Sequence, residues 1–248
     1  MSQLWIDLAL LAGGLVGGIV NVLAGGGSFL TLPLLLFLGM PAATANGTNR
    51  VGIVLQNVSA VASFHRHRVL DWPLALWMSL PTCLGSLLGA MAALRIEEQA
   101  FRKILAVLMA AITVGSLLWR PEAEPEASAA SRGSRLMMAA GFFAAGIYGG
   151  FIQAGVGFLI LAVTTLAGLD LVRGNAVKVL TILLSTVVSL GPFLAAGHVE
   201  WRPGLVLGAG MLVGGLVGAR LTVLKGQRWV RGFVTLAVLV VAVALWLD

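Results

Sequence analysis

Two apolar stretches of this 248-residue chain carry amide and cationic side chains at helical spacing. Residues three and four apart share one face of a helix, and a polar face inside an apolar helix must meet a cavity or another polar group. Each stretch also contains one cation, and a cation beside amide donors is suited to binding an anion. The spacing therefore predicts an anion site, with Asn46, Asn49, Arg50, Gln56 and Asn57 from the first stretch and Asn175 and Lys178 from the second.

Two interpretations of the cations Arg50 and Lys178 stay open at this stage. Each lies near the start of a predicted helix, over 46–64 and 175–196, so two charges and two helix N-termini could converge on one ligand. This requires that both helix starts reach well into the membrane, as they would beside re-entrant hairpins. Alternatively, both charges lie at the lipid interface, where long basic side chains contact head groups.

A glycine-rich break that occurs twice, at 21–28 and at 153–157, is the second candidate feature. A helix that ends inside a membrane leaves N–H groups that lipid cannot satisfy. Interrupted hydrophobic segments at matching positions of two halves are typical of transporter sites, whereas the alternative is close glycine packing between helices. Ser28 is a residue type that caps helix N-termini. The predicted site members from the breaks are Asn21, Gly25, Gly26, Gly27 and Ser28, with Gln153, Gly155 and Gly157.

Motifs for catalysis and metal binding are missing from the sequence. It has no Walker A motif, no H-E-x-x-H and no G-x-S-x-G, and its single cysteine, Cys83, excludes a cysteine-based metal cluster. Asp7 is the only carboxylate near the edge of an apolar span, so no relay of carboxylates is visible. We therefore expect no catalytic residue, no metal and no cofactor, and a protein that is not an enzyme.

The composition places the chain in a membrane. Hydrophobic residues make up 59% and charged residues 10% of it, against about 25% charged in soluble domains, and the mean hydropathy is +0.99. Basic residues account for the net charge of +6 and lie in loops, where they orient membrane helices rather than bind nucleic acid.

The elements that must position these residues are predicted as an all-α polytopic membrane protein with about eight to ten helical segments. Two segments, 28–39 and 157–167, are too short to span and are expected to be broken or re-entrant. A polar cytoplasmic linker at 120–135 separates a first membrane repeat, 1–119, from a second, 136–248. The predicted helices are 5–23, 28–39, 46–64, 73–94, 101–119, 136–153, 157–167, 175–196, 203–224 and 229–247.

The two repeats are copies of one unit with opposite orientation. At an offset of 129, polar and glycine positions coincide, including Gly39 with Gly168, Asn46 with Asn175, Trp72 with Trp201, and Gly85 with Gly214. Basic loops favour the cytoplasmic side, which places 65–72, 120–135, 168–178 and 224–231 inside and 39–49, 95–103 and 197–202 outside. Corresponding loops then lie on opposite sides, as in the inverted repeats of many secondary transporters.

The same motifs resemble those of a known family. They read GGIVNVLAGGGS at 17–28, LPL at 32–34 and ANGTN at 45–49, then GGFIQAGVG at 149–157 and RGNAVK at 173–178. Over nearly the whole chain they are similar to the sulfite exporter TauE/SafE family of membrane transporters. The resemblance implies transport of sulfite, sulfoacetate or other sulfur-containing organic anions, mostly outward, across the bacterial cytoplasmic membrane.

Together, residues and resemblance predict a multi-pass secondary transporter for a small anion. The glycine breaks would supply backbone donors, the amides would orient the ligand, and Arg50 or Lys178 would supply charge. Alternating access would rock one repeat against the other. The alternatives are an anion channel with the same site and a non-transporting membrane scaffold. The expected partners are the anion, a coupling proton or sodium ion and the lipid bilayer, with a homodimer left open and no nucleic acid.

Overall fold

A computed structural model describes residues 2–104, 107–108, 111 and 132–247, and all regular structure within them is helical. The prediction of an all-α polytopic membrane protein is confirmed. Within the described residues, four helical segments are long and apolar enough to cross a membrane, namely Gln3–Ala24, Trp72–Ala93, Leu171–Ala195 and Trp201–Lys225. The helices are α1 (Gln3–Ala24), α2 (Ser28–Phe37), α3 (Ala42–Arg66), α4 (Trp72–Ala93), α6 (Arg132–Phe151), α7 (Val156–Leu166), α8 (Leu171–Ala195) and α9 (Trp201–Leu247).

The two short helices are half-helices that follow a break. α2 has 10 residues and α7 has 11, so each rises about 15 Å, half of a hydrocarbon core about 30 Å thick. Each break contains a glycine in the left-handed region: Gly25, with φ +89°, directly after α1, and Gly155, with φ +77°, directly before α7. Glycine takes this conformation without the strain that a Cβ would cause.

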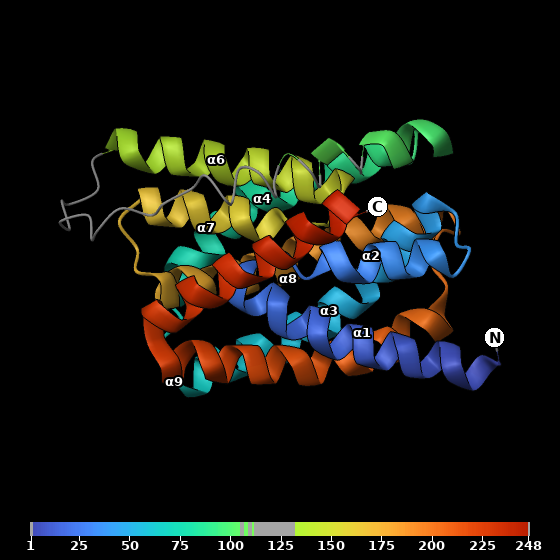
Figure 1. The fold of residues 1–248 in the computed structure, drawn as a ribbon. Helices are drawn as coiled ribbons and strands as arrows, with labels where there is room; N and C mark the ends of the chain where they lie inside the picture. Colours follow the sequence, from blue (N-terminus) through green and yellow to red (C-terminus); the bar gives the residue numbers. More distant parts are fainter. Residues whose placement is uncertain (1, 105–106, 109–110, 112–131, 248) are drawn as a thin grey trace.

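The fourth helix of each repeat packs on the other repeat. α4 packs mainly against α6 and α8, whereas α9 packs mainly against α1 and α3, and Figure 1 shows α4 beside α6 at the top and α9 beside α1 at the bottom. Glycines allow this approach: a Cβ added to Gly14 would lie 2.3 Å from the Leu207 carbonyl oxygen, and one added to Gly89 would lie 2.0 Å from that of Ile147. The repeats are therefore intertwined rather than side by side.

We call the two resulting groups of helices the first bundle and the second bundle. The first bundle contains α1, α2, α3 and residues 201–225 of α9, because α2 packs on α1 and α3. The second bundle contains α4, α6, α7 and α8, because α7 packs on α6 and α8.

The central helices α3 and α8, which occupy equivalent places in the two repeats, run antiparallel, as inverted repeats require. Phe64 near the end of α3 packs with Val179 near the start of α8, while Gly47 near the start of α3 lies against Phe193 near the end of α8. The backbone N–H of Glu200 also donates to the Thr48 hydroxyl at 2.9 Å. Loops 39–49 and 197–202 thus lie on one side, as predicted; which side is cytoplasmic stays a prediction.

Several predicted helix boundaries differ from those in the structure. α3 and α8 each begin four residues earlier than predicted, at Ala42 and Leu171, so their cations lie about two turns inside the helices rather than at the start. The helical assignment of α9 continues through both segments predicted as separate helices, 203–224 and 229–247, while Figure 1 shows the chain turning back between them. The predicted linker 120–135 lies outside the described residues up to 131, and its last four residues begin α6. Most of the predicted helix 101–119 also lies outside the described residues.

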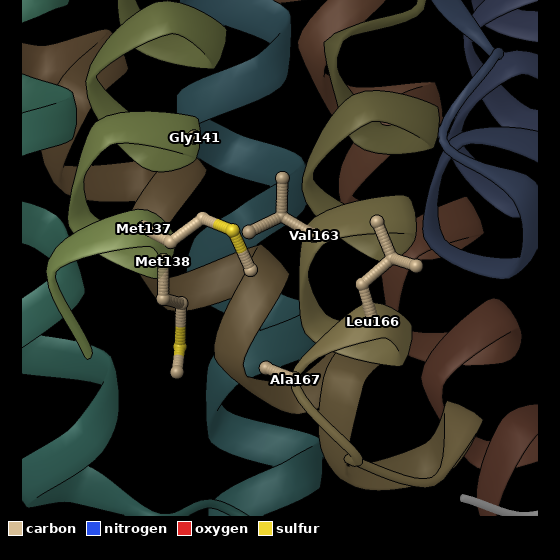
Figure 2. Close-up of a pocket in the computed structure, with 6 residues that line it drawn as sticks. All are labelled: Met137, Met138, Gly141, Val163, Leu166 and Ala167. Atoms are coloured by element: carbon tan, nitrogen blue, oxygen red, sulfur yellow. The ribbon is translucent and has the colours of Figure 1, made fainter. Parts of the chain in front are cut away.

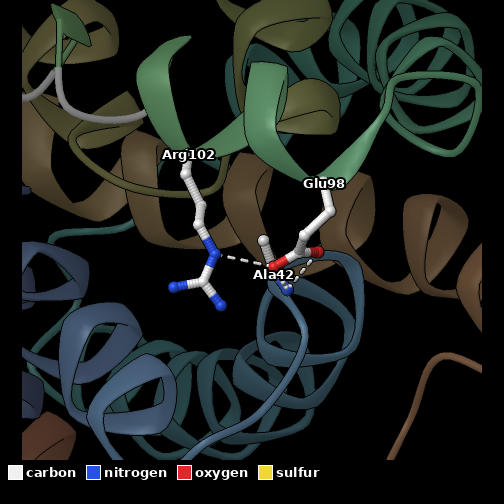
Figure 3. Close-up of polar contacts among 3 residues, drawn as sticks. All are labelled: Ala42, Glu98 and Arg102. Carbon is white, nitrogen blue, oxygen red and sulfur yellow. Dashed lines mark hydrogen bonds and ion pairs between the residues drawn. The ribbon is translucent and has the colours of Figure 1, made fainter.

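The early starts of α3 and α8 are explained by carboxylates that cap them. The Asp170 side chain accepts hydrogen bonds from the backbone N–H groups of Val172 and Arg173 at the start of α8. Pro41 holds the matching position before α3 and cannot cap in this way. Glu98 replaces it from a distant segment: both of its carboxylate oxygens lie 2.8 Å from the Ala42 backbone nitrogen, and Arg102 pairs with it at 2.7 Å (Figure 3).

Glu98→Ala should therefore lower the stability of the protein by about 1 kcal/mol, because the first turn of α3 loses its anionic acceptor. In purified protein in detergent we expect a fall in melting temperature of about 2–4 °C. Glu97→Ala is the matched control, since Glu97 is exposed and its side chain makes no polar contact among the described residues. Equal melting temperatures for the two variants would contradict the capping role.

Candidate functional site

The two glycine breaks meet each other in the interior. A Cβ added to Gly25 would lie 2.4 Å from the carbonyl carbon of Gly157, and one added to Gly157 would lie 2.3 Å from the Cα atom of Gly25. The rings of Phe29 and Phe158, in the first turns of the two half-helices and matched at the offset of 129, stack with centroids 6.4 Å apart. Two segments separated by more than half the chain therefore form one crossing, which lies between the two bundles.

Each cation reaches across this crossing to the broken helix of the other repeat. The Arg50 guanidinium, from α3, donates to the backbone carbonyl of Gly150 and to the Gln153 side chain at 2.8 Å, both at the end of α6. The Lys178 ammonium, from α8, donates to the backbone carbonyls of Asn21 at 3.1 Å and Val22 at 2.8 Å, in the last turn of α1. A helix C-terminus carries partial negative charge, so both cations cap helix ends inside the protein.

The hydrogen-bond acceptors of both cations are neutral. Arg50 is 0% exposed and Lys178 1% exposed, and neither forms a salt bridge with a carboxylate among the described residues. Arg50 adds a hydrogen bond to the Ser189 hydroxyl at 2.7 Å and lies 4.6 Å from the centroid of the Phe193 ring. Placement of the two charges at the lipid interface is thus wrong. A buried cation without an anionic partner is costly, and helix ends offset only part of its charge.

Amide side chains surround the two cations within each bundle. In the first bundle, the Asn21 amide donates to the Gln56 side-chain oxygen at 3.0 Å, and the Thr31 hydroxyl donates to Asn49 at 2.7 Å. In the second bundle, the Gln153 amide donates to the Thr186 hydroxyl at 3.1 Å. The structure therefore connects most of the predicted polar members to the crossing.

Asn46 and Asn57 bond differently. The Asn46 amide donates to the Phe151 backbone carbonyl at 2.8 Å, which adds a third contact from α3 to the end of α6. The Asn57 amide donates to the Ile53 carbonyl within its own helix, and no hydrogen bond among the described residues joins it to the crossing.

Several polar groups near the crossing are buried and have no hydrogen-bond partner among the described residues. The prediction that Ser28 caps α2 is wrong. Gly27 occupies the capping position, Ser28 is the first helical residue, and its hydroxyl has no partner among the described residues. α7 also lacks a side-chain cap. The N-termini of both half-helices are consequently uncapped and electropositive. The buried side-chain atoms without a partner include Ser28 Oγ, Asn46 Oδ1, Asn49 Nδ2, Arg50 Nε, and Nδ2 and Oδ1 of Asn175.

The motif search missed Thr31, Ser189 and Phe193. Ser189 lies about one turn after Ser185 on α8, so helical spacing could have found it. Thr31 and Phe193 lie in apolar sequence, and only the fold shows that they contact Asn49 and Arg50.

A separate cavity of about 240 Å³ lies between α6 and α7. Figure 2 shows Met137 of α6 reaching toward Val163 of α7, and the other lining residues are Met138, Gly141, Leu166 and Ala167. The lining offers no charged or amide side chain, so this cavity does not suit an anion. No group of three or more metal-ligating side chains occurs among the searched, described residues.

The unpartnered Asn175 gives a prediction with two opposite effects. Asn175→Leu removes a buried amide that has no hydrogen-bond partner among the described residues, so it should raise the melting temperature, since an unsatisfied buried polar group costs about 1–3 kcal/mol. If the amide serves to bind an anion, the same change should reduce anion flux into proteoliposomes.

Asn46→Leu is the matched variant at the equivalent position. Because its amide is hydrogen bonded to Phe151, this change should lower the melting temperature. An Asn175→Leu protein that is more stable and transports at the wild-type rate would remove Asn175 from the site.

Comparisons with known proteins agree with this architecture. The sequence model described as Sulfite exporter TauE/SafE matches residues 10–245. A probable membrane transporter protein of Haemophilus influenzae is 32% identical, over 90% of this chain and 88% of its own length. The probable membrane transporter protein YfcA of Escherichia coli K12 is 31% identical, over 94% and 87%, and YunE of Bacillus subtilis is 24% identical, over 83% and 85%. No solved structure matches the chain.

Proposed function

This chain belongs to the sulfite exporter TauE/SafE family of membrane transporters, and from that membership we propose that it carries a small anion, sulfite or an organosulfonate, out across the cytoplasmic membrane. The anion would bind where the two glycine breaks cross. The observation that carries the proposal is the pair of buried cations, Arg50 and Lys178, which have only neutral acceptors among the described residues.

The chemistry of the crossing suits an oxyanion. A guanidinium presents several donors in one plane and an ammonium is a compact charge, and both form stronger hydrogen bonds with an ionised oxygen than with a neutral carbonyl. Nδ2 of Asn175 and the hydroxyl of Ser28, which have no partner in the described part of the chain, would add neutral donors. A sulfite or sulfonate group presents three oxygens to such donors. The uncapped N-termini of α2 and α7 add favourable potential for negative charge.

Flux measurements in proteoliposomes test this proposal. We expect saturable uptake of labelled sulfite or sulfoacetate, with sulfate and taurine as the comparison panel and protein-free liposomes as the control. Accumulation above the equilibrium level when a proton or sodium gradient is imposed would support a coupled transporter. A flux that never exceeds equilibrium under either gradient would favour the channel. Absence of flux and binding for every anion in the panel would overturn the proposal and favour a scaffold.

A further inference from the structure

We propose that the moving bodies of this transporter are the two intertwined bundles rather than the two sequence repeats, and that Arg50 and Lys178 are reciprocal latches between the bundles that the substrate anion releases. The inference rests on the proposed function. It replaces the expectation that one repeat rocks against the other.

Helix packing argues against the repeats as separate rigid bodies. The largest helix contacts in the described chain join α1 to α9 and α4 to α6, and both pairs combine one helix from each repeat. Their backbones touch: a Cβ on Gly214 would lie 2.3 Å from the Leu15 carbonyl oxygen, and a Cβ on Gly146 would lie 2.4 Å from that of Thr82. Because close-packed helices slide past each other only with difficulty, these pairs should move together.

The contact between the bundles is of a different kind. It consists mainly of the packing of α3 against α8, and at the centre Gly25 lies on Gly157. The central hydrogen bonds that cross it come from Arg50 and Asn46 to the end of α6, and from Lys178 to the end of α1. The amide pairs beside them, Asn21 with Gln56 and Gln153 with Thr186, stay within one bundle. The two cations therefore supply five of the polar bonds across the centre and the Asn46 amide supplies one, whereas neutral side chains supply those within the bundles.

An anion at the crossing would exchange these bonds. Its ionised oxygens are better acceptors for Arg50 and Lys178 than the carbonyls of Gly150, Asn21 and Val22. Each cation that turns to the anion leaves a helix end of the other bundle, so binding removes a bond across the interface. A ligand shifts a conformational equilibrium by its difference in affinity for the two states, and here the state with released latches holds the anion more tightly.

Two cysteine pairs separate the two kinds of motion. Asp7 of α1 and Arg202 of α9 form a salt bridge at 2.9 Å, which joins the two repeats but lies within the first bundle. Pro41 and Glu98 belong to the same repeat but to different bundles. Pro41 directly precedes α3 of the first bundle, whereas Glu98 lies one turn before Phe101, which packs against Phe151 of α6 in the second bundle with ring centroids 5.8 Å apart. The Glu98 side chain reaches across to cap α3 (Figure 3).

The experiment places each pair in a Cys83→Ser background and joins it with a short bis-maleimide. Cross-linking is completed and the reagent removed before sulfite is added, because sulfite cleaves disulfides and also reacts with maleimides. Sulfite flux in proteoliposomes is then compared with that of the same double-cysteine protein left unlinked, which controls for the substitutions themselves.

We expect the Asp7→Cys/Arg202→Cys protein to keep its flux after cross-linking and the Pro41→Cys/Glu98→Cys protein to lose most of its flux. The reverse pattern would overturn the inference in favour of moving repeats. Retained flux in both linked proteins, or lost flux in both, would also overturn it. Absence of flux in the unlinked proteins and in the wild type would instead overturn the proposed function, and the inference with it.

Discussion

Arg50→Gln should reduce anion flux by roughly 30-fold to several thousand-fold, because truncating one partner of a buried hydrogen-bonded charge costs about 2–5 kcal/mol. The variant keeps an amide of similar polarity next to Gly150 and Ser189 but has no charge. If the arginine served only to cap α6, the neutral amide could replace part of that role. If the positive charge holds the anion, flux is lost even where the protein folds.

Two controls distinguish loss of charge from loss of fold. Arg50→Lys restores the charge without the guanidinium fork, so it should recover part of the flux that Arg50→Gln loses. Arg202→Gln removes an arginine whose side chain is 62% exposed in its salt bridge with Asp7, and exposed salt bridges contribute about 0–1 kcal/mol, so its flux should stay near the wild-type value. Gel filtration and melting temperature report the fold. A well-folded Arg50→Gln protein with wild-type flux would exclude Arg50 from anion binding.

The sequence predicted the broken helices because the break requires particular residues. Gly25 and Gly155 have positive φ values. Because this backbone conformation favours glycine, each break appears in the sequence as a glycine-rich segment, once in each repeat. Asn46 and Asn175 were likewise visible, because a buried amide in an apolar helix is rare enough to stand out.

The partners of these residues were not predictable in the same way. Glycines at 85 and 89 indicate that α4 packs closely on another helix, yet they carry no information on which helix that is. The packing of α4 on the second repeat and of α9 on the first therefore could not be predicted from the sequence and is seen only in the structure. The same holds for the cation contacts, because backbone carbonyls accept hydrogen bonds at every position and leave no signal in the sequence. Arg50 and Lys178 are not at equivalent positions of the two repeats, because at the offset of 129 Lys178 matches Asn49. Both cations still donate to a backbone carbonyl at the end of a broken helix.

The cap of α3 escaped prediction for a related reason. Asp170 stands directly before α8, where a capping carboxylate is expected, whereas the acceptor for α3 is Glu98, 56 residues from Ala42. A rule that inspects only the residues next to a helix start finds the Asp170 cap but not the Glu98 cap. Both helices are capped by a carboxylate and begin four residues earlier than predicted, so Arg50 and Lys178 lie about two turns inside them rather than at their starts.

Substitution of the glycines at the crossing should have the largest effect on the fold. Gly25→Ala introduces a Cβ at φ +89° and places it 2.4 Å from the backbone of Gly157. Positive φ for a residue other than glycine costs about 1–3 kcal/mol, and overpacking against backbone adds about 1–3 kcal/mol. We expect a melting temperature well below that of the wild type, or failure to purify as a monodisperse protein.

Two further variants separate strain from contact. Gly39 has nearly the same φ, +87°, but no atom would lie within 4 Å of an added Cβ, so Gly39→Ala measures backbone strain alone. Gly157 does not have a positive φ, yet its Cβ would lie 2.3 Å from the Gly25 Cα atom, so Gly157→Ala measures the contact alone. If the breaks touch as described, Gly157→Ala should destabilise the protein even without strain, and Gly25→Ala should exceed Gly39→Ala. Equal melting temperatures for Gly25→Ala and Gly39→Ala would mean that the two half-helices do not meet, and the site between the bundles would lose its geometric basis.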